Sequence, residues 1–138
     1  MSLTRIPAPL RQQVWDRAVG ACEYCRIRES EVLLPHEPDH VIAVQHGGTT
    51  TAENLALACS QCNRLKGPNI ASVDPLTGAT EGLFHPRRDR WEQNFEFVGV
   101  RLGALTPIGR ATVALLRLNA PERLRLRAAL IESGRLFV

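Results

Sequence analysis

Hydrophobic positions at the start of the chain recur with the period of an α-helix. Leu10, Val14 and Ala18 are four residues apart, a spacing that puts their side chains on one face of a helix. Pro7 suits the first turn of such a helix and Gly20 suits its end. We therefore expect a short N-terminal helix that packs on the core and carries the residues after it into position.

Two stretches in the middle of the chain are rich in β-branched and apolar residues. Residues 39–44 and 54–58 predict strands, and the polar, glycine-containing residues 45–52 predict a loop between them. A helix is expected over residues 61 to about 65, where Gly67-Pro68 would end it. The predicted order is strand, loop, strand, helix.

Prolines interrupt the segment before these strands. Val32-Leu33-Leu34 begins an extended segment, but Pro35 and Pro38 follow it. Each proline removes a backbone donor that a sheet would use. We therefore expect an edge strand or an irregular strand here.

The second half of the chain has the pattern of a strand and two helices. Residues 94–98 predict a strand after the turn-rich segment 74–78. Thr106-Pro107 is typical of a helix N-cap and first helical residue, and residues 119–122 are typical of a second helix start. The expected apolar face of this second helix comprises Leu124, Ala128 and Ile131. These helices would mainly serve packing.

Composition places the chain among ordinary globular proteins. It has 138 residues, of which 44% are hydrophobic and 22% are charged, so one domain with a substantial core is expected. No apolar run approaches the roughly 20 residues that span a bilayer, and the N-terminus lacks the apolar stretch of a secretory signal. We therefore expect a cytoplasmic protein with no membrane partner.

The basic residues are unusual in kind rather than in number. The net charge is +3, and Lys66 is the only lysine among 17 basic residues. Arginine binds phosphate groups through two parallel hydrogen bonds, so the excess of arginine fits a nucleic-acid partner. A genome rich in G and C would give the same bias, and composition leaves both explanations open.

Four cysteines form two Cys-x-x-Cys pairs, Cys22 with Cys25 and Cys59 with Cys62. Without an export signal, this pattern favours metal binding over disulfides. A two-residue spacer lets both thiolates reach one ion about 2.3 Å away, as in structural zinc sites. The main alternative is a thioredoxin-like redox motif, which needs only one such pair placed after a strand in a βαβ unit. The pattern therefore predicts structural zinc.

Asp39-His40 lies between the two cysteine pairs, and Asn63 follows directly after the last cysteine. Cleavage of a phosphodiester requires an activated water, neutralisation of the phosphate and stabilisation of the leaving oxygen. A neutral histidine can supply the first and a divalent cation the other two. Because adjacent residues on a strand point to opposite faces, a carboxylate on the metal and an imidazole on the water would suit this pair.

Further polar side chains could complete such a site. Mg²⁺ prefers oxygen ligands and keeps several waters, so one carboxylate and the amide oxygen of Asn63 can suffice. Arg64 and Lys66 follow at once and are candidates for phosphate or DNA binding. Asn54, which can both donate and accept, is a candidate hydrogen-bonding clamp on the loop.

Taken in order, these motifs resemble the HNH endonuclease family, whose core is the ββα-metal finger or His-Me finger. The residues that carry the resemblance are Asp39-His40, Asn54, the run from Cys62 to Gly67 and the two cysteine pairs. The resemblance implies an α+β fold with this core, a four-cysteine structural zinc site, an N-terminal helix and an appended C-terminal helical region. A single domain would then cover residues 1–138, with its core at about 14–70 and its extension at about 71–138.

The resemblance also implies a role for each candidate residue. His40 would be the general base, Asp39 and Asn63 would hold catalytic Mg²⁺ or another divalent cation, and Asn54 would order the loop beneath the histidine. The four cysteines would bind structural Zn²⁺. The sequence departs from the family at Pro38, where many relatives have an apolar strand residue, and this proline could distort the strand.

The predicted function is a metal-dependent DNA endonuclease that hydrolyses phosphodiester bonds in duplex or structured DNA. The alternative is a catalytically inactive, zinc-stabilised DNA-binding module, which the proline before Asp39 keeps open. A protein-interaction module that forms a homodimer through the C-terminal helices is a third hypothesis. Phosphate contacts carry no sequence information by themselves, so the motifs predict chemistry rather than a target sequence.

Overall fold

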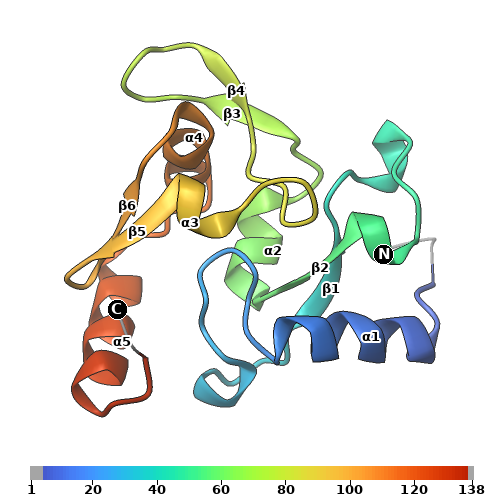
Figure 1. The fold of residues 1–138 in the computed structure, drawn as a ribbon, viewed down its shortest axis with the longest axis horizontal. Coiled ribbons are helices and arrows are strands. Elements are labelled where there is room, and N and C mark those ends of the chain that lie inside the picture. Colours follow the sequence, from blue (N-terminus) through green and yellow to red (C-terminus); the bar gives the residue numbers. More distant parts are fainter. Residues whose placement is uncertain (1–4, 137–138) are drawn as a thin grey trace. The chain divides into compact units, whose positions relative to one another are not determined.

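The computed structural model describes residues 5–136, and these form two compact units. The first unit contains the described part of Met1–Ile70 together with His85–Asp89. The second contains Ala71–Phe84 and the described part of Arg90–Val138. Each unit mixes helices and strands (Figure 1), so the predicted α+β class is confirmed. The single nuclease domain over residues 1–138 stays a prediction.

The predicted N-terminal helix is present as α1, Ala8–Ala18. Its buried Val14 packs in a core with two leucines of the second strand. The helix ends at Val19, whose φ of 55° is left-handed, and Gly20 follows with φ 71°. A Cβ on Gly20 would lie 2.6 Å from the Trp15 ring, which would have to shift, and the positive φ by itself favours glycine.

Two short strands and a helix follow in the predicted order. β1 is Glu37–His40, β2 is Leu55–Ala58 and α2 is Ser60–Lys66. β1 and β2 pair antiparallel, and α2 contacts both strands (Figure 1). Short 3-10 helices occupy the connections at Glu29–Glu31, Val44–His46 and Ala52–Asn54. Because β2 is buried along its whole length, this strand pair lies at the core of the first unit.

The strand predicted over residues 39–44 is wrong beyond His40. After this residue the chain bends, because the Asn54 side chain takes both backbone groups of Ile42. Its Oδ1 accepts from the Ile42 amide and its Nδ2 donates to the Ile42 carbonyl, both at 2.9 Å. A residue whose donor and acceptor are used in this way cannot extend a sheet ladder. The predicted extended segment at Val32-Leu33-Leu34 is a series of bends instead.

Pro38 lies within β1 without disturbing the strand pairing. Its partner is Leu57, whose amide donates to Glu23 Oε2 and whose carbonyl accepts from the Glu23 amide, both at 2.8 Å. Since both backbone groups of Leu57 point away from β1, Pro38 occupies a non-hydrogen-bonded position, where a missing amide hydrogen costs no ladder bond. The distortion predicted from this proline is therefore wrong, because β1 pairs along its whole length.

The second unit contains two further strand pairs and three helices. Its elements in chain order are β3 Ala71–Val73, β4 Thr80–Gly82, α3 Trp91–Asn94, β5 Phe95–Val98, β6 Arg101–Ala104, α4 Pro107–Leu115 and α5 Pro121–Glu132. β3 pairs with β4 and β5 with β6, both antiparallel. The sequence predicted β5, one residue too long, and missed the other three strands, which are short and hold few β-branched residues.

The two C-terminal helices begin where the sequence predicts, and two arginines share the inward face of the second. Thr106 caps α4, since its Oγ1 accepts from the Gly109 amide at 2.9 Å. α5 begins at Pro121 as expected. Its fully buried residues are Arg123, Arg127 and Leu130, and the predicted Leu124, Ala128 and Ile131 lie next to them, half-buried. Arg127 turns inward because its guanidinium donates to the backbone carbonyls of Val100 and Leu118.

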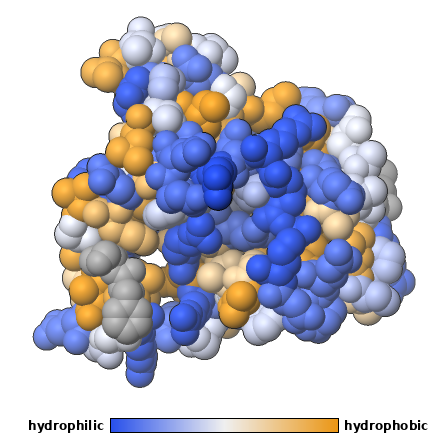
Figure 2. Space-filling model, in the orientation of Figure 1, coloured by the Kyte–Doolittle hydropathy of each residue, from blue (hydrophilic) through white to orange (hydrophobic). Residues whose placement is uncertain are grey.

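Apolar side chains on the surface are scattered. On the face drawn in Figure 2 they form small separate groups among hydrophilic ones. Leu33, Val19 and Leu76 are among the large apolar residues that are most exposed, and isolated cases of this kind are ordinary. None of the helices in residues 5–136 combines the length and the apolar character needed to cross a membrane.

Candidate active site and metal centre

The structure brings the four cysteines together as a compact thiol cluster. Cys22, Cys25, Cys59 and Cys62 are all buried, and their Sγ atoms lie within 4.8 Å of one another. The Sγ atoms of Cys25 and Cys59 are 3.7 Å apart. Four sulfurs bound tetrahedrally at about 2.3 Å from zinc would be separated by about 3.8 Å. The cluster therefore fits a four-coordinate zinc ion.

Local backbone geometry prepares these thiols for a cation. The Cys25 amide points at Cys22 Sγ at 3.5 Å, and the Cys62 amide points at Cys59 Sγ at 3.4 Å. Such N–H groups stabilise thiolate charge. Burial raises the pKa of the Cys22 thiol, whereas hydrogen bonds from Cys22 and the other two thiols lower the pKa of Cys59. A bound divalent cation would compensate the negative charge that burial disfavours.

The first cysteine loop is attached directly to the central strand pair. Glu23, the residue after Cys22, exchanges two hydrogen bonds with the backbone of Leu57 in β2. The other carboxylate oxygen of Glu23 pairs with Arg87 Nη2. Burial lowers the pKa of Arg87 to about 10, and the guanidinium stays charged at neutral pH. The thiol cluster and β2 are thus held as one body within the first unit.

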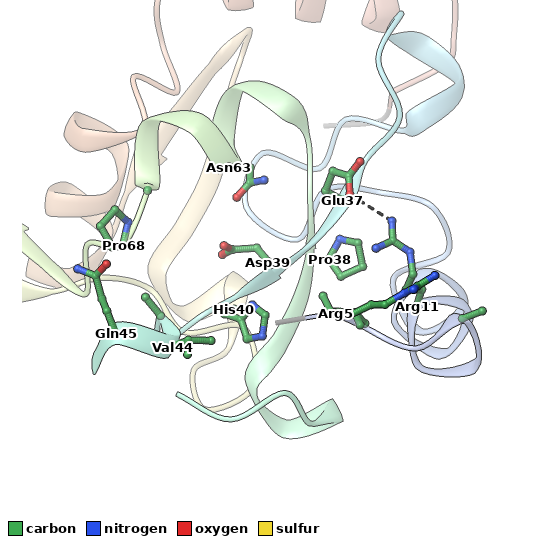
Figure 3. Close-up of a pocket in the computed structure, with 14 residues that line it drawn as sticks. Arg5, Arg11, Glu37, Pro38, Asp39, His40, Val44, Gln45, Asn63 and Pro68 are labelled. Carbon is green, nitrogen blue, oxygen red and sulfur yellow. Dashed lines mark hydrogen bonds and ion pairs between the residues drawn. The ribbon is translucent and has the colours of Figure 1, made fainter. Parts of the chain in front are cut away.

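A pocket of about 1300 Å³ opens beside β1. Residues that line it include Arg5, Arg11, Asp39, His40, Gln45 and Asn63 (Figure 3). Asn63 extends from α2 toward Asp39, while Arg11 forms an ion pair with Glu37 at 3.2 Å. Three of the predicted site residues therefore share one pocket, although they come from different elements.

Asp39 is buried in β1 between two partners. Lys66 Nζ lies 3.1 Å from Asp39 Oδ2, and the Tyr24 hydroxyl donates to the same oxygen at 3.3 Å. Burial raises the pKa of Asp39, and the ammonium of Lys66 counteracts part of that shift. A carboxylate with Asn63 close by is an oxygen donor set, which suits a hard divalent cation that keeps several waters.

The side chain of His40 contacts a residue of the loop after β1. Its Nε2 lies 2.9 Å from Thr50 Oγ1, in the polar loop before Asn54. Its backbone carbonyl accepts from Lys66 Nζ at 3.2 Å. The imidazole of His40 and the carboxylate of Asp39 thus have separate partners, as expected for neighbouring strand residues, yet both line the pocket.

Asn54 ties together the loop that carries Thr50. Besides its two bonds to Ile42, its Nδ2 donates to the Thr49 carbonyl at 2.8 Å. Gly48 leaves room for this arrangement, because a Cβ there would lie 1.6 Å from the Ile42 carbonyl oxygen and 2.8 Å from Asn54 Nδ2. The contacts of Asn54 are thus with the loop backbone rather than with the pocket.

The two basic candidates lie in different surroundings. Arg64 is exposed on α2, where a phosphate could reach it. Lys66 is 2% exposed, and its ammonium is engaged by Asp39 and by the His40 carbonyl. The predicted direct contact between Lys66 and a DNA phosphate therefore does not fit the structure, because the side chain points into the first unit.

Tyr24 and Thr50 are site residues that the sequence did not reveal. Tyr24 lies between Cys22 and Cys25, where zinc binding requires no particular residue type. Thr50 is one of three threonines in a polar segment, and sequence alone does not show which of them reaches His40. The one signal in the sequence was that both residues lie close to the motifs along the chain. Closeness along the chain does not show which side chains are in contact.

One of three comparisons with known proteins found a match. A family model described as HNH endonuclease matches residues 22–69, a stretch that includes both cysteine pairs, β1, β2 and α2. The resemblance to the HNH family is therefore confirmed for these residues, and the match indicates a nuclease-type function. The comparison with curated proteins and the comparison with solved structures each found no match.

Proposed function

We propose that the protein is a metal-dependent DNA endonuclease of the HNH type. The observation that carries the proposal is the pocket shared by Asp39, His40 and Asn63 within the matched residues 22–69. We also propose that β1, β2 and α2 constitute a ββα-metal core. The pocket, at about 1300 Å³, exceeds the roughly 300–1,000 Å³ of typical small-molecule sites, which supports a polymeric substrate.

In this proposal His40 acts as the general base. When Nε2–H donates to Thr50 Oγ1, Nδ1 is the unprotonated ring nitrogen and can accept a proton from water. Thr50 would hold the ring in this tautomer and orientation. The water that loses its proton to Nδ1 then attacks phosphorus in line, and a 5′-phosphate is left.

Asp39 and Asn63 would hold a divalent cation, Mg²⁺ or another. When bound, such a cation supplies charge neutralisation on the phosphate and stabilises the departing 3′ oxygen. Asp39 contributes a carboxylate held in place by buried partners, and Asn63 contributes an amide oxygen. Lys66 fixes this end of β1 to α2 through its contacts to Asp39 and the His40 carbonyl.

The cysteine cluster would hold structural Zn²⁺. Its thiols are buried and do not line the pocket, so their role is to hold the first loop, β2 and the start of α2 together. DNA is the proposed partner, with exposed Arg64, Arg5 and Arg11 available for backbone contacts. The cytoplasmic location and the homodimer through α4 and α5 stay predictions.

Plasmid nicking by zinc-loaded protein tests the proposal. Supercoiled DNA is incubated with EDTA or with Mg²⁺, Mn²⁺ or Ni²⁺, beside the variants His40→Ala and His46→Ala. We expect cation-dependent relaxation that falls at least about 100-fold in His40→Ala and persists in His46→Ala, because His46 is exposed in the connection that follows β1. Cleavage by zinc-loaded His40→Ala at the wild-type rate would refute the assignment of the base.

An inactive, zinc-stabilised DNA-binding module is the second candidate. One observation favours it: the ammonium of Lys66 already neutralises the Asp39 carboxylate and so weakens its attraction for a second cation. Salt-sensitive DNA binding with no cleavage under any cation would select this alternative. The regular pairing of Pro38 removes the reason that the sequence offered for it.

A further inference from the structure

The cysteine loop contacts the candidate catalytic carboxylate through a single hydroxyl. Tyr24 lies between Cys22 and Cys25, and it is 1% exposed. Its hydroxyl donates to Asp39 Oδ2 at 3.3 Å. The loop that would bind zinc therefore touches the residue that would bind the catalytic cation.

The contacts of Asp39 divide its two oxygens. Among residues 5–136, the Tyr24 hydrogen bond and the Lys66 ion pair both use Oδ2. Oδ1 takes part in neither contact, and Asp39 lines the pocket together with Asn63. Two donors on one oxygen fix the rotation of the carboxylate, and a ligand whose orientation is fixed loses less conformational freedom when a cation binds.

The neighbouring spacer residue has a different task. Glu23 bonds to the backbone of Leu57 in β2 and pairs with Arg87, and these contacts attach the loop to the strand without reaching Asp39. Of the two residues between Cys22 and Cys25, Glu23 thus attaches the loop to β2, and Tyr24 contacts Asp39. Glu23 is accordingly a matched control for Tyr24, because both are polar, largely buried and equally close to the zinc ligands.

We propose that Tyr24 is a positioning residue that links the zinc loop to the cation site, by holding Asp39 so that Oδ1 faces the pocket. The inference rests on the proposed function in taking Asp39 as the cation ligand. It adds a second role for the cysteine loop, which stabilises the first unit and also sets the affinity of the site for its divalent cation.

Mn²⁺ binding to zinc-loaded protein, measured by calorimetry, tests this role directly. Tyr24→Phe keeps the ring and removes only the hydroxyl, and we expect Mn²⁺ to bind about three- to tenfold more weakly, as for loss of one hydrogen bond. Glu23→Gln should bind Mn²⁺ with the wild-type affinity. Asp39→Asn should lose the binding, which identifies the site, and zinc content measured by atomic emission should equal that of the wild type in all three variants.

A spectroscopic test requires no substitution. The chain contains one tyrosine, so protein made with 3-fluorotyrosine gives one fluorine resonance that reports on Tyr24. Titration with diamagnetic Mg²⁺ should shift this resonance in the labelled wild type and in labelled Glu23→Gln, but not in labelled Asp39→Asn. This measurement tests the link between Tyr24 and the cation site even when Tyr24→Phe fails to fold.

The outcomes separate this inference from the proposed function. Weaker Mn²⁺ binding in Tyr24→Phe alone supports the inference, whether or not the wild type cuts DNA. Unchanged or tighter binding in Tyr24→Phe, equal weakening in Glu23→Gln, or a fluorine resonance unmoved by bound Mg²⁺ overturns it while plasmid nicking stands. A wild-type protein that binds neither Mn²⁺ nor Mg²⁺ also overturns the inference about Tyr24. If the same preparation does not nick plasmid DNA, the proposed nuclease function is refuted separately.

Discussion

Two buried carboxylates, one in each unit, lie beside a basic side chain and yet differ in their electrostatics. Asp39 in the first unit is paired with Lys66, and burial raises its pKa. Asp74 in the second unit is paired with Arg110, whose hydrogen bonds lower the pKa of Asp74 to about 2. At Asp39 the effect of burial on the pKa outweighs that of Lys66, whereas at Asp74 the hydrogen bonds from Arg110 outweigh burial.

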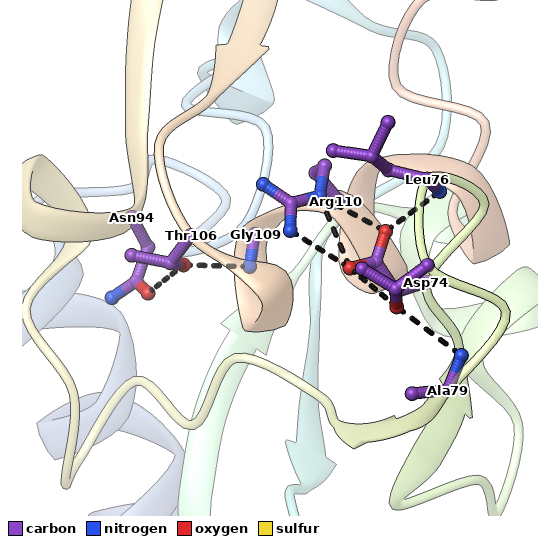
Figure 4. Close-up of polar contacts among 8 residues, drawn as sticks. Asp74, Leu76, Ala79, Asn94, Thr106, Gly109 and Arg110 are labelled. Atoms are coloured by element: carbon purple, nitrogen blue, oxygen red, sulfur yellow. Dashed lines mark hydrogen bonds and ion pairs between the residues drawn. The ribbon is translucent and has the colours of Figure 1, made fainter.

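Asp74 has donors on both of its oxygens. Arg110 Nε lies 2.9 and 3.1 Å from the two oxygens, and its Nη2 lies 2.9 Å from Oδ2 (Figure 4). The Leu76 amide and the Thr77 hydroxyl add two further hydrogen bonds. Such a carboxylate has little capacity left for another cation, and it holds the β3–β4 turn to α4.

Asp39, in contrast, receives its two partners on one oxygen. Burial removes water from a carboxylate, and this is unfavourable when hydrogen bonds and ion pairs replace only part of that water. A cation bound from the pocket would reduce this cost. A salt bridge by itself therefore does not show that a buried carboxylate has only a structural role. Asp39 differs from Asp74 because one of its oxygens takes no part in these contacts and because the residue lines a pocket.

Removal of the metal is expected to have the largest effect, and to affect the first unit. Structural zinc contributes roughly 10–16 kcal/mol in small zinc domains, more than the whole free energy of unfolding of a typical domain. Chelation, or Cys59→Ser with Cys62→Ser, should therefore unfold the first unit. Hydrogen exchange should show lost protection in α2 and β2, while α4 in the second unit keeps its protection. Protection in the first unit that survives chelation would contradict this prediction.

Breaking the Asp39 pair should have the next largest effect on stability. Lys66→Met leaves a buried carboxylate without its cation, which costs about 3–5 kcal/mol of unfolding free energy. Denaturant unfolding measures this loss. The double variant Lys66→Met with Asp39→Asn should recover part of it, because the buried charge is then gone. A stable single variant would mean that Lys66 is not the counterion.

Two asparagines allow a matched comparison between the units. Asn54 takes both backbone groups of Ile42, and Asn119 takes both backbone groups of Leu102 at 2.8 Å. Each substitution by alanine should cost about 2–3 kcal/mol in denaturant unfolding, because buried backbone groups lose their partners. Plasmid nicking should fall with Asn54→Ala and persist with Asn119→Ala. Equal loss of nicking in both variants would show that lowered stability alone impairs cleavage.

Acid should weaken the second unit through Asp74, the smallest of these effects. The folded pKa of about 2 lies below the ordinary 3.8, so the stabilising contribution is complete above about pH 4 and is lost as pH falls through about 2. Asp74→Asn should flatten this part of the stability profile measured by denaturant unfolding between about pH 5 and pH 2. An equally steep acid slope in the variant would assign the effect to other groups.

Local patterns predicted the helices better than the strands. α1 and α4 carry their own proline, capping and periodic signals, which act within a few residues. β1 ends early because Asn54, which lies beyond the polar loop in the chain, captures the backbone of Ile42. On α5 the sequence did not show that Arg127 is buried beside the predicted apolar residues, because this arginine donates to distant backbone carbonyls. A contact between residues far apart in sequence produces no periodic pattern of hydrophobic and polar residues, so it cannot be predicted from such a pattern.

The sequence by itself determined the chemical inventory: two cysteine pairs with zinc spacing, Asp39-His40, and Asn63 directly after a cysteine. Ligand types and short spacings are local properties, so they can be read without a fold. Only the tertiary structure decided which groups face the pocket. It turned Lys66 inward onto Asp39, brought Thr50 to His40 and Tyr24 to Asp39, because burial and pairing are settled by packing across the chain.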